Sequence, residues 1–244
     1  MNRDAMRVLR QVQGAWEKAV HGVGQMNQSS LIKPQTPYNI FQLDQNAPDN
    51  VVKINVGPIV FNVPERPNHR SPDLYIVVKG WLTFEGPDFR ALPLKTKDFG
   101  TEVAYFRSKA GGLEHVYGAH YDMDERRPGH PVFHAQIGAQ MEFGANVQEL
   151  FGLDTQVINK MESILGTVRT PSAQMDVFSV MTQICADHLM GEAAAAEVSG
   201  AFKGLRQACD FLIGAAHRLA YLNTVPAIEC YRSTHWYESP AANA

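Results

Sequence analysis

The sequence predicts an α+β protein with an N-terminal helix, an antiparallel meandering sheet of about five to seven strands, and a C-terminal helical layer packed on the sheet. Apolar residues recur with helical spacing before residue 21 and after residue 150, whereas those between alternate as in strands. The strand candidates follow one another through connections too short for helical crossovers, which favours antiparallel pairing. We expect residues 1–150, with the sheet, and residues 151–244, with the helices, to form one compact unit.

Composition places the chain among ordinary globular proteins. Its 244 residues are 45% hydrophobic and 19% charged, and they are enough to bury a sizeable core. The formal net charge of −3 does not indicate non-specific nucleic-acid binding, which depends on clustered positive charge. The three cysteines are odd in number and widely spaced, which indicates reduced thiols in the cytoplasm. With no signal-like segment and no run of eighteen apolar residues, we expect neither secretion nor a membrane span.

The N-terminal half contains one helix followed by strands. From Arg3 to about His21, apolar residues recur every three or four positions, as in an amphipathic helix. Val51 to Val63 is broken by Gly57-Pro58, which predicts either two short strands or one bent edge strand. Leu74 to Phe84 has one apolar face and one mixed face that carries Lys79 and Trp81. The remaining strand candidates are Tyr38–Leu43, Phe89–Leu94, Glu102–Arg107, Leu113–Met123 and Pro131–Phe143.

Three helices are expected after Gly144. Asp154 is a suitable N-cap for the first, which ends near Gly166. Thr170-Pro171 opens the second, with Thr as the cap and Pro at the first helical position, and it runs to Gly191. The third extends from about Glu192 to Leu222, and its apolar seam either packs on the second helix or binds a partner or second subunit.

The most distinctive segment runs from Glu114 to Asp124 and continues from His130 to Gln136. In an extended strand His120, Asp122 and Asp124 share one face, with Glu114, Val116 and Gly118, while His115, Tyr117 and Tyr121 share the other. If residues 125–129 close a hairpin, His120 lies opposite the region of His134 to Gln136, and Asp122 lies near Val132 to His134. The imidazoles and the carboxylate would then converge.

This convergence suits three kinds of site. His120, Asp122 and His134 can act as general acid, base and orienting carboxylate, or they can join His130 as ligands of a divalent transition metal. They can instead line a pocket for a small ligand or nucleotide. They can also form a structural network in which the buried polar groups satisfy one another. The residue pattern leaves these interpretations open.

Standard phosphate-binding, dinucleotide, zinc-protease and nucleophile-elbow motifs are not found in the sequence. The pattern His120-Tyr121-Asp122, His130-Pro131-x-x-His134 and Arg169-Thr170-Pro171 resembles uncharacterised bacterial protein families, some of which neighbour toxin-antitoxin or phage-defence genes. The resemblance covers about a third of the chain, and its motifs are short. It implies that Arg169 belongs with the histidine hairpin and supplies a cation for an anionic group.

Two functions follow as expectations. The first is a cytosolic accessory or regulatory protein of a bacterial defence or toxin-antitoxin system, with a ligand pocket lined by His and Asp and a helical face for a protein partner. The second is a phosphodiester or RNA hydrolase, with or without a divalent metal. In it His120, Asp122 and His134 carry the chemistry, and Arg126 or Arg169 holds phosphate.

Overall fold

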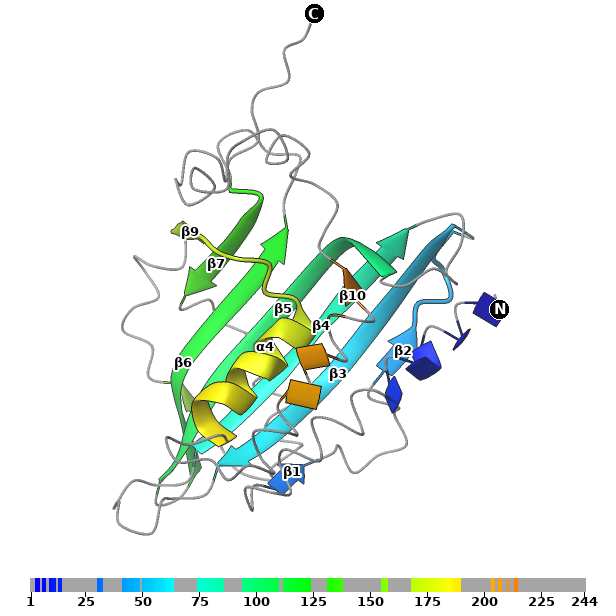
Figure 1. The fold of residues 1–244 in the computed structure, drawn as a ribbon. Helices are drawn as coiled ribbons and strands as arrows, with labels where there is room; N and C mark the ends of the chain where they lie inside the picture. Colours follow the sequence, from blue (N-terminus) through cyan, green and yellow to red (C-terminus); the bar gives the residue numbers. More distant parts are fainter. Residues whose placement is uncertain are drawn as a thin grey trace, which may run out of the picture.

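The protein is built on one large, mainly antiparallel sheet crossed by a short helix (Figure 1). The main path of the sheet has seven strands in the order β1-β3-β4-β5-β6-β7-β9, and β2, β8 and β10 pair with strands of this path. The structure, a computed structural model, describes residues 41–48, 50–63, 74–85, 94–109, 112–123, 131–137 and 168–189, with shorter pieces at 3–4, 6–7, 9–11, 13–14, 30–32, 155–157, 203–204, 206–207, 210 and 213–214.

Five strands that follow one another in the chain form the centre of the sheet, and each pairs antiparallel with the next. The antiparallel meander predicted from the short connections is therefore confirmed. The strands are β3 (Val51–Val63), β4 (Leu74–Glu85), β5 (Leu94–Lys109), β6 (Gly112–Met123) and β7 (Phe133–Ile137). The shorter strands are β1 (Ser30–Ile32), β2 (Phe41–Leu43), β8 (Thr155–Val157), β9 (Arg169–Pro171) and β10 (Ile213–Gly214).

The sequence predicted either two short strands or one bent edge strand here. The structure shows one strand, β3, with a local irregularity. Its register against β4 shifts between Val56 and Ile59, where Gly57-Pro58 lies. Proline has no N–H to donate to a neighbouring strand, so an irregular position accommodates it. β3 is not an edge strand, however, because β1 and β2 pair with it on the side away from β4. The bend lies between the segments paired with these two short strands.

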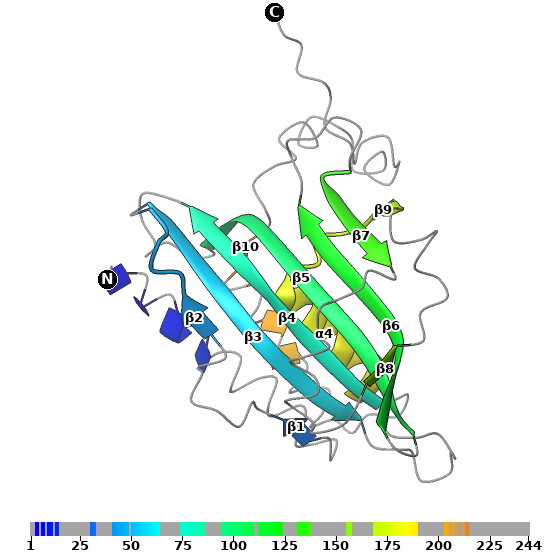
Figure 2. The same ribbon diagram turned by 180° about the vertical axis from the view of Figure 1, so that it is seen from behind.

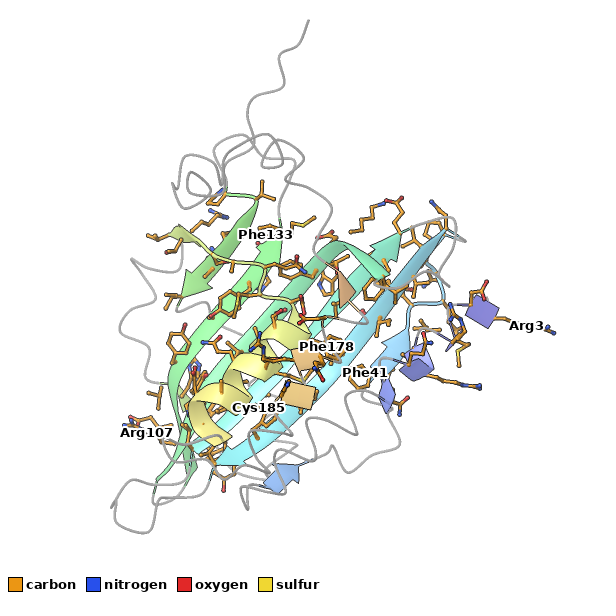
Figure 3. The ribbon with its side chains drawn as sticks, viewed as in Figure 1. Arg3, Phe41, Arg107, Phe133, Phe178 and Cys185 are labelled. Atoms are coloured by element: carbon orange, nitrogen blue, oxygen red, sulfur yellow. The ribbon has the colours of Figure 1, made fainter. Side chains whose placement is uncertain are left out.

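A helix, α4 (Val177–Ile184), packs on one face of the sheet over β4 and β5. Its N-cap is Asp176, whose Oδ1 accepts hydrogen bonds from the backbone N–H groups of Phe178 and Ser179. Phe178 stacks on Phe41 of β2 with a centroid distance of 6.0 Å, and the side chains of both lie between helix and sheet (Figure 3). A π-helical turn, Cys185–Leu189, continues the helix.

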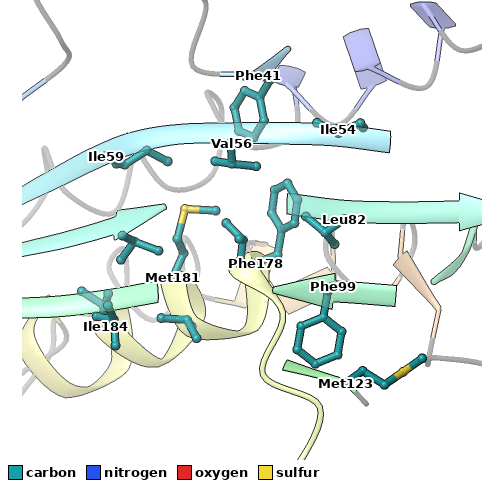
Figure 4. Packing of buried hydrophobic residues seen from close by; sticks show 14 of the residues in the cluster. Phe41, Ile54, Val56, Ile59, Leu82, Phe99, Met123, Phe178, Met181 and Ile184 are labelled. Carbon is teal, nitrogen blue, oxygen red and sulfur yellow. The ribbon is translucent and has the colours of Figure 1, made fainter. Parts of the chain in front are cut away.

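The core lies between α4 and this face of the sheet. Met181 of the helix projects toward Val56 and Ile59 of β3, Ile184 is buried in the same cluster, and Phe99 lies on its other side (Figure 4). Leu9, which has helical backbone together with the other described residues between 3 and 14, is also buried in this cluster. Cys185 is buried in the same cluster. Burial of these apolar side chains is the main term that holds the helix on the sheet.

The C-terminal half differs from the predicted helices. Thr155–Val157, expected to begin a helix capped by Asp154, forms β8 and pairs with Leu113 to His115 of β6. β7 pairs only with residues 119–123 of β6, so the main chain at the start of β6 has hydrogen-bonding groups available on that side. Pairing with these groups outweighs the weak local preference for helix.

The predicted opening of the second helix is also wrong. Thr170 and Pro171 belong to β9, which pairs with β7, and the helix begins six residues after Pro171 at Val177, with Asp176 as its cap. Residues 203–204, 206–207 and 210 have helical backbone, but Ile213–Gly214 forms β10 beside β5 rather than continuing the predicted third helix. Most of that helix and its partner-binding seam lie outside the described residues.

The face of the sheet opposite α4 carries polar side chains over its middle and a small apolar cluster toward one end. The cluster consists of Val60, Val77, Ala104, Phe106 and Leu113. Figure 2 shows the sheet from behind, where its strands lie in front of α4. We refer to it below as the open face only because no described helix packs on it; its residues Val60, Val77 and Ala104 are fully buried. None of the helices in the described part of the chain is both long and apolar enough to cross a membrane.

Candidate functional site: a His–Asp–His cluster on the open face

Strands β6 and β7 bring three of the predicted site residues together. Their register places His120 opposite Gln136 and Asp122 opposite His134, which confirms the arrangement expected of the hairpin. Ala119 and Met123 of β6 point into the core beneath α4. Because successive side chains of a strand alternate between faces, His120 and Asp122 project from the open face, as does His134 directly across from Asp122.

Asp122 lies between the two imidazoles. Its Oδ2 is 3.0 Å from Nε2 of His120, and its Oδ1 is 2.8 Å from Nε2 of His134. An ionised carboxylate only accepts hydrogen bonds, so Nε2 of His120 carries the proton that it donates to Oδ2. The two histidines differ in exposure: the His134 side chain is 2% exposed, whereas those of His120 and Asp122 are 28% and 29% exposed. One histidine therefore supports the carboxylate from inside, and the other lies at the surface.

The electrostatics of the cluster favour a charged carboxylate. Burial by itself raises the pKa of Asp122, but the hydrogen bonds and charges of His120 and His134 outweigh burial and hold that pKa well below its usual range. Asp122 is therefore ionised at neutral pH and fixes the orientation of both rings. His120 retains its second ring nitrogen, Nδ1, as the one that can exchange a proton or a hydrogen bond with a ligand.

Arg169 lies on the same row of the sheet as His120. β9 pairs with β7 so that Arg169 faces Gln136, and Gln136 in turn faces His120. Side chains directly opposite one another share a face, so Arg169 and His120 flank the neutral Gln136 on the open face. On the other side of His120 lies Glu102 of β5, whose Oε2 forms an ion pair of 3.0 Å with Nζ of Lys79. The side chains of this row that can still contact an anion are therefore His120 and Arg169.

A β-bulge alters the predicted face of His115. The register of β5 against β6 shifts between Tyr105 and Phe106, with Val116 as the extra residue, and Val116 is 47% exposed. As a result, His115 packs against Phe106 on the open face, with ring centroids 5.2 Å apart. The expectation that His115 shares the face of Tyr117 is thus wrong, because a bulge reverses the alternation of side chains beyond it. His115 remains several residues from the cluster.

Sequence reasoning missed two residues beside the cluster, Trp81 and Gly100. The register places Gly100 of β5 between Trp81 of β4 and Asp122 of β6. The mixed face of the strand Leu74 to Phe84 already indicated that Trp81 lies away from the core. Nothing in the local pattern indicated that it lies two strands from Asp122, because that depends on the pairing of three strands.

Several predicted site residues are not placed. Arg126 and His130 lie outside the described residues, as does Asp124. In the described part of the chain, no three His, Cys, Asp or Glu side chains are arranged to hold a metal ion. Instead, each imidazole turns its Nε2 to a different oxygen of Asp122. A metal held by His120, Asp122, His130 and His134 stays a prediction, since its fourth ligand is not described.

Comparisons with known proteins give no relative from which a role could be transferred. No family model matches the chain, no curated protein matches it, and no solved structure matches it. The function therefore has to be argued from the side chains of the open face.

Proposed function

We propose that the protein is a ligand-binding accessory or regulatory protein that holds the phosphate of a small ligand or nucleotide at the His120–Asp122–His134 cluster. The observation that carries the proposal is the unequal exposure of the two histidines bound to one carboxylate. A purely structural network has no need of a partly exposed imidazole, whereas a binding site needs one group fixed from behind and one presented to solvent. Asp122 and His134 act here as positioning residues.

Phosphate is the favoured group because the row carries the cation of Arg169 and a ring nitrogen of His120 that can form a hydrogen bond. His120 and Arg169 lie on either side of Gln136, about two strand spacings apart, or roughly 10 Å between main chains. The long Arg side chain can close this gap and bind two phosphate oxygens at once. Lys79 and Glu102 already pair with each other, so they add little net charge to the site. Binding should therefore depend on His120 and Arg169.

The same proposal places the protein in a bacterial defence or toxin-antitoxin system. Its support is the pattern of His120-Tyr121-Asp122 and Arg169-Thr170-Pro171, of which His120, Asp122 and Arg169 lie on one face of the sheet. The proposed protein partner would use the C-terminal segment. Ligand binding at the cluster does not require that partner, so it can be tested with the isolated chain.

Binding of ribose 5-phosphate, measured by calorimetry and by NMR shifts of the histidine ring protons, tests the proposal. His120→Gln and Arg169→Gln should each weaken binding at least about tenfold, as expected when one charge-assisted contact is lost. Lys97→Gln is the matched control, because it also removes one positive charge but Lys97 pairs with Glu85 at 2.9 Å away from the row. No binding, or equal binding by all three variants, would contradict the proposal.

A phosphodiester or RNA hydrolase is the second candidate, and a specific contact favours it. The 3.0 Å contact of Asp122 with Nε2 of His120 orients the ring so that Nδ1 can accept or donate a proton. In that case His120 would be the acid–base group, and Arg169 would stabilise the phosphate in the transition state. Hydrolysis of a model phosphodiester by the native chain, lost in His120→Gln with its fold intact, would select this candidate. Absence of hydrolysis together with intact ribose 5-phosphate binding would exclude it.

A further inference from the structure

A carboxylate lies directly beside the proposed anion site. Glu102 of β5 is opposite His120 of β6, on the row that continues to Arg169. The Cβ atoms of directly opposite residues are about 4.5–5.5 Å apart, a gap that a glutamate side chain can span. Both side chains also reach solvent, since that of Glu102 is 32% exposed and that of His120 is 28% exposed. The row therefore holds a negative group that is able to contact the same histidine as the ligand.

In the structure, Glu102 is turned toward its other neighbouring strand. Lys79 of β4 lies opposite Glu102, and Nζ of Lys79 is 3.0 Å from Oε2 of Glu102. His120 directs its Nε2 to Oδ2 of Asp122, also at 3.0 Å. A lysine ammonium carries a full positive charge, and hydrogen bonds between charged groups are stronger than those between neutral groups. The pair with Lys79 therefore decides which way the carboxylate of Glu102 points.

We infer that Glu102 is a competitor for the anion site that is built into the sheet, and that Lys79 is the positioning residue that keeps it away from His120. The inference rests on the proposed function and adds a means of regulating the same site. Once the pair with Lys79 is broken, His120 is the side chain directly opposite the carboxylate on its other side. A carboxylate there repels phosphate, and it accepts a hydrogen bond from a protonated imidazole as a phosphate oxygen does.

Binding of ribose 5-phosphate to Lys79→Gln, Glu102→Gln and the double variant tests the inference as a double-mutant cycle. Lys79→Gln alone should weaken binding about tenfold, because it releases Glu102. In the Glu102→Gln background, the same change should alter binding by less than about twofold, since no carboxylate is left to release. Equal effects of Lys79→Gln in both backgrounds would show that Lys79 acts on the ligand by itself, and they would overturn the inference.

The salt concentration separates this effect from a long-range attraction between Lys79 and the ligand. Lys79 and His120 are two strand spacings apart, about 10 Å between main chains. At about 0.15 M salt the screening length is about 8 Å, so the direct attraction between exposed charges at that distance is largely screened. The cycle should therefore be measured at this salt concentration.

Two further variants serve as controls. Lys97→Gln also removes the lysine of a Lys–Glu pair, that with Glu85 at 2.9 Å, and it should leave binding within about twofold of native because the pair lies away from the row. Lys79→Arg keeps a cation for Glu102 and should retain native binding. Loss of binding in Lys97→Gln would contradict the inference, because release of any surface glutamate would then have the same effect.

NMR of the ring protons of His120 reports the movement of Glu102 without a ligand. Their chemical shifts should change in Lys79→Gln and return toward the native values in the double variant. If ribose 5-phosphate binds through His120 but Lys79→Gln leaves its affinity unchanged, the competitor inference is overturned while the proposed function stands. If ribose 5-phosphate does not bind the native chain, both are overturned.

Discussion

Asp122 lies directly opposite His134 in the β6–β7 pair, and its Oδ1 is 2.8 Å from Nε2 of that buried imidazole. Together with the contact to His120, this makes Asp122 the residue on which the geometry of the cluster depends. The same contacts stabilise the fold and orient the site. Their contribution to stability can therefore be measured separately from any ligand.

Asp122→Ala should lower the free energy of unfolding by about 2 to 3 kcal/mol, because a charged acceptor is lost and a buried imidazole loses that partner. Urea denaturation followed by circular dichroism measures the change. Glu85→Ala is the control, since its pair with Lys97 is exposed and should change stability by less than about 1 kcal/mol. Equal stability of Asp122→Ala and the native chain would show that the cluster contributes little to folding.

The stabilisation by Asp122 should disappear in acid. The pKa of this carboxyl is lower in the folded chain than its ordinary value of 3.8. A depressed pKa stabilises the fold fully above the unfolded value, and the effect is lost as the pH falls toward the folded value. The difference in unfolding free energy between the native chain and Asp122→Asn should therefore shrink below about pH 4. A difference that stays constant through this range would argue against the depressed pKa.

Gly80→Ala should destabilise the protein by about 1 to 3 kcal/mol, the usual cost of overpacking a core. A Cβ at Gly80 would collide with the carbonyl oxygen of Gly100 and would lie 2.7 Å from Cγ2 of Val177 on α4. Gly14→Ala, in helical backbone with open space around it, should instead stabilise by up to about 1 kcal/mol. Thermal denaturation of the two variants gives opposite shifts if α4 packs on β4 as described.

Asp176→Ala should cost about 2 kcal/mol, the upper range for loss of a helix cap. The buried Asp176 carboxylate also accepts hydrogen bonds from the side chains of Gln174 and Ser179, at 3.0 and 3.1 Å. Asp176→Asn should retain most of the stability, because an amide oxygen can still accept from the N–H groups of Phe178 and Ser179. If Ala and Asn prove equivalent in urea denaturation, the cap is not what begins this helix.

Tyr105 should remain un-ionised through the ordinary alkaline titration of the folded protein. Burial, followed by the charges of Tyr117 and Asp187, raises the pKa of Tyr105 to about 12. Tyr105→Phe should therefore leave the tyrosinate absorbance unchanged up to about pH 10, the ordinary pKa of a tyrosine. A smaller absorbance change in the variant below that pH would show that Tyr105 is accessible and titrates normally.

The sequence by itself determined the parts that depend on short-range periodicity. Alternation along Leu74 to Phe84 indicated which side of β4 is buried, and the two-residue spacing of His120 and Asp122 placed them on one face. The short break before His134 was enough to anticipate that it pairs with this segment. These features follow from the geometry of a single strand or hairpin, so the local residues specify them.

Only the tertiary structure decided the rest. Thr155–Val157 and Thr170-Pro171 carry local signals for helix starts, yet both pair with strands that are distant in the chain. The bulge at Val116 and the approach of Trp81 to Gly100 likewise depend on how several strands align. Main-chain hydrogen bonds with distant strands stabilise these segments more than their local helix propensity does. The local sequence does not indicate which distant strand a segment will pair with.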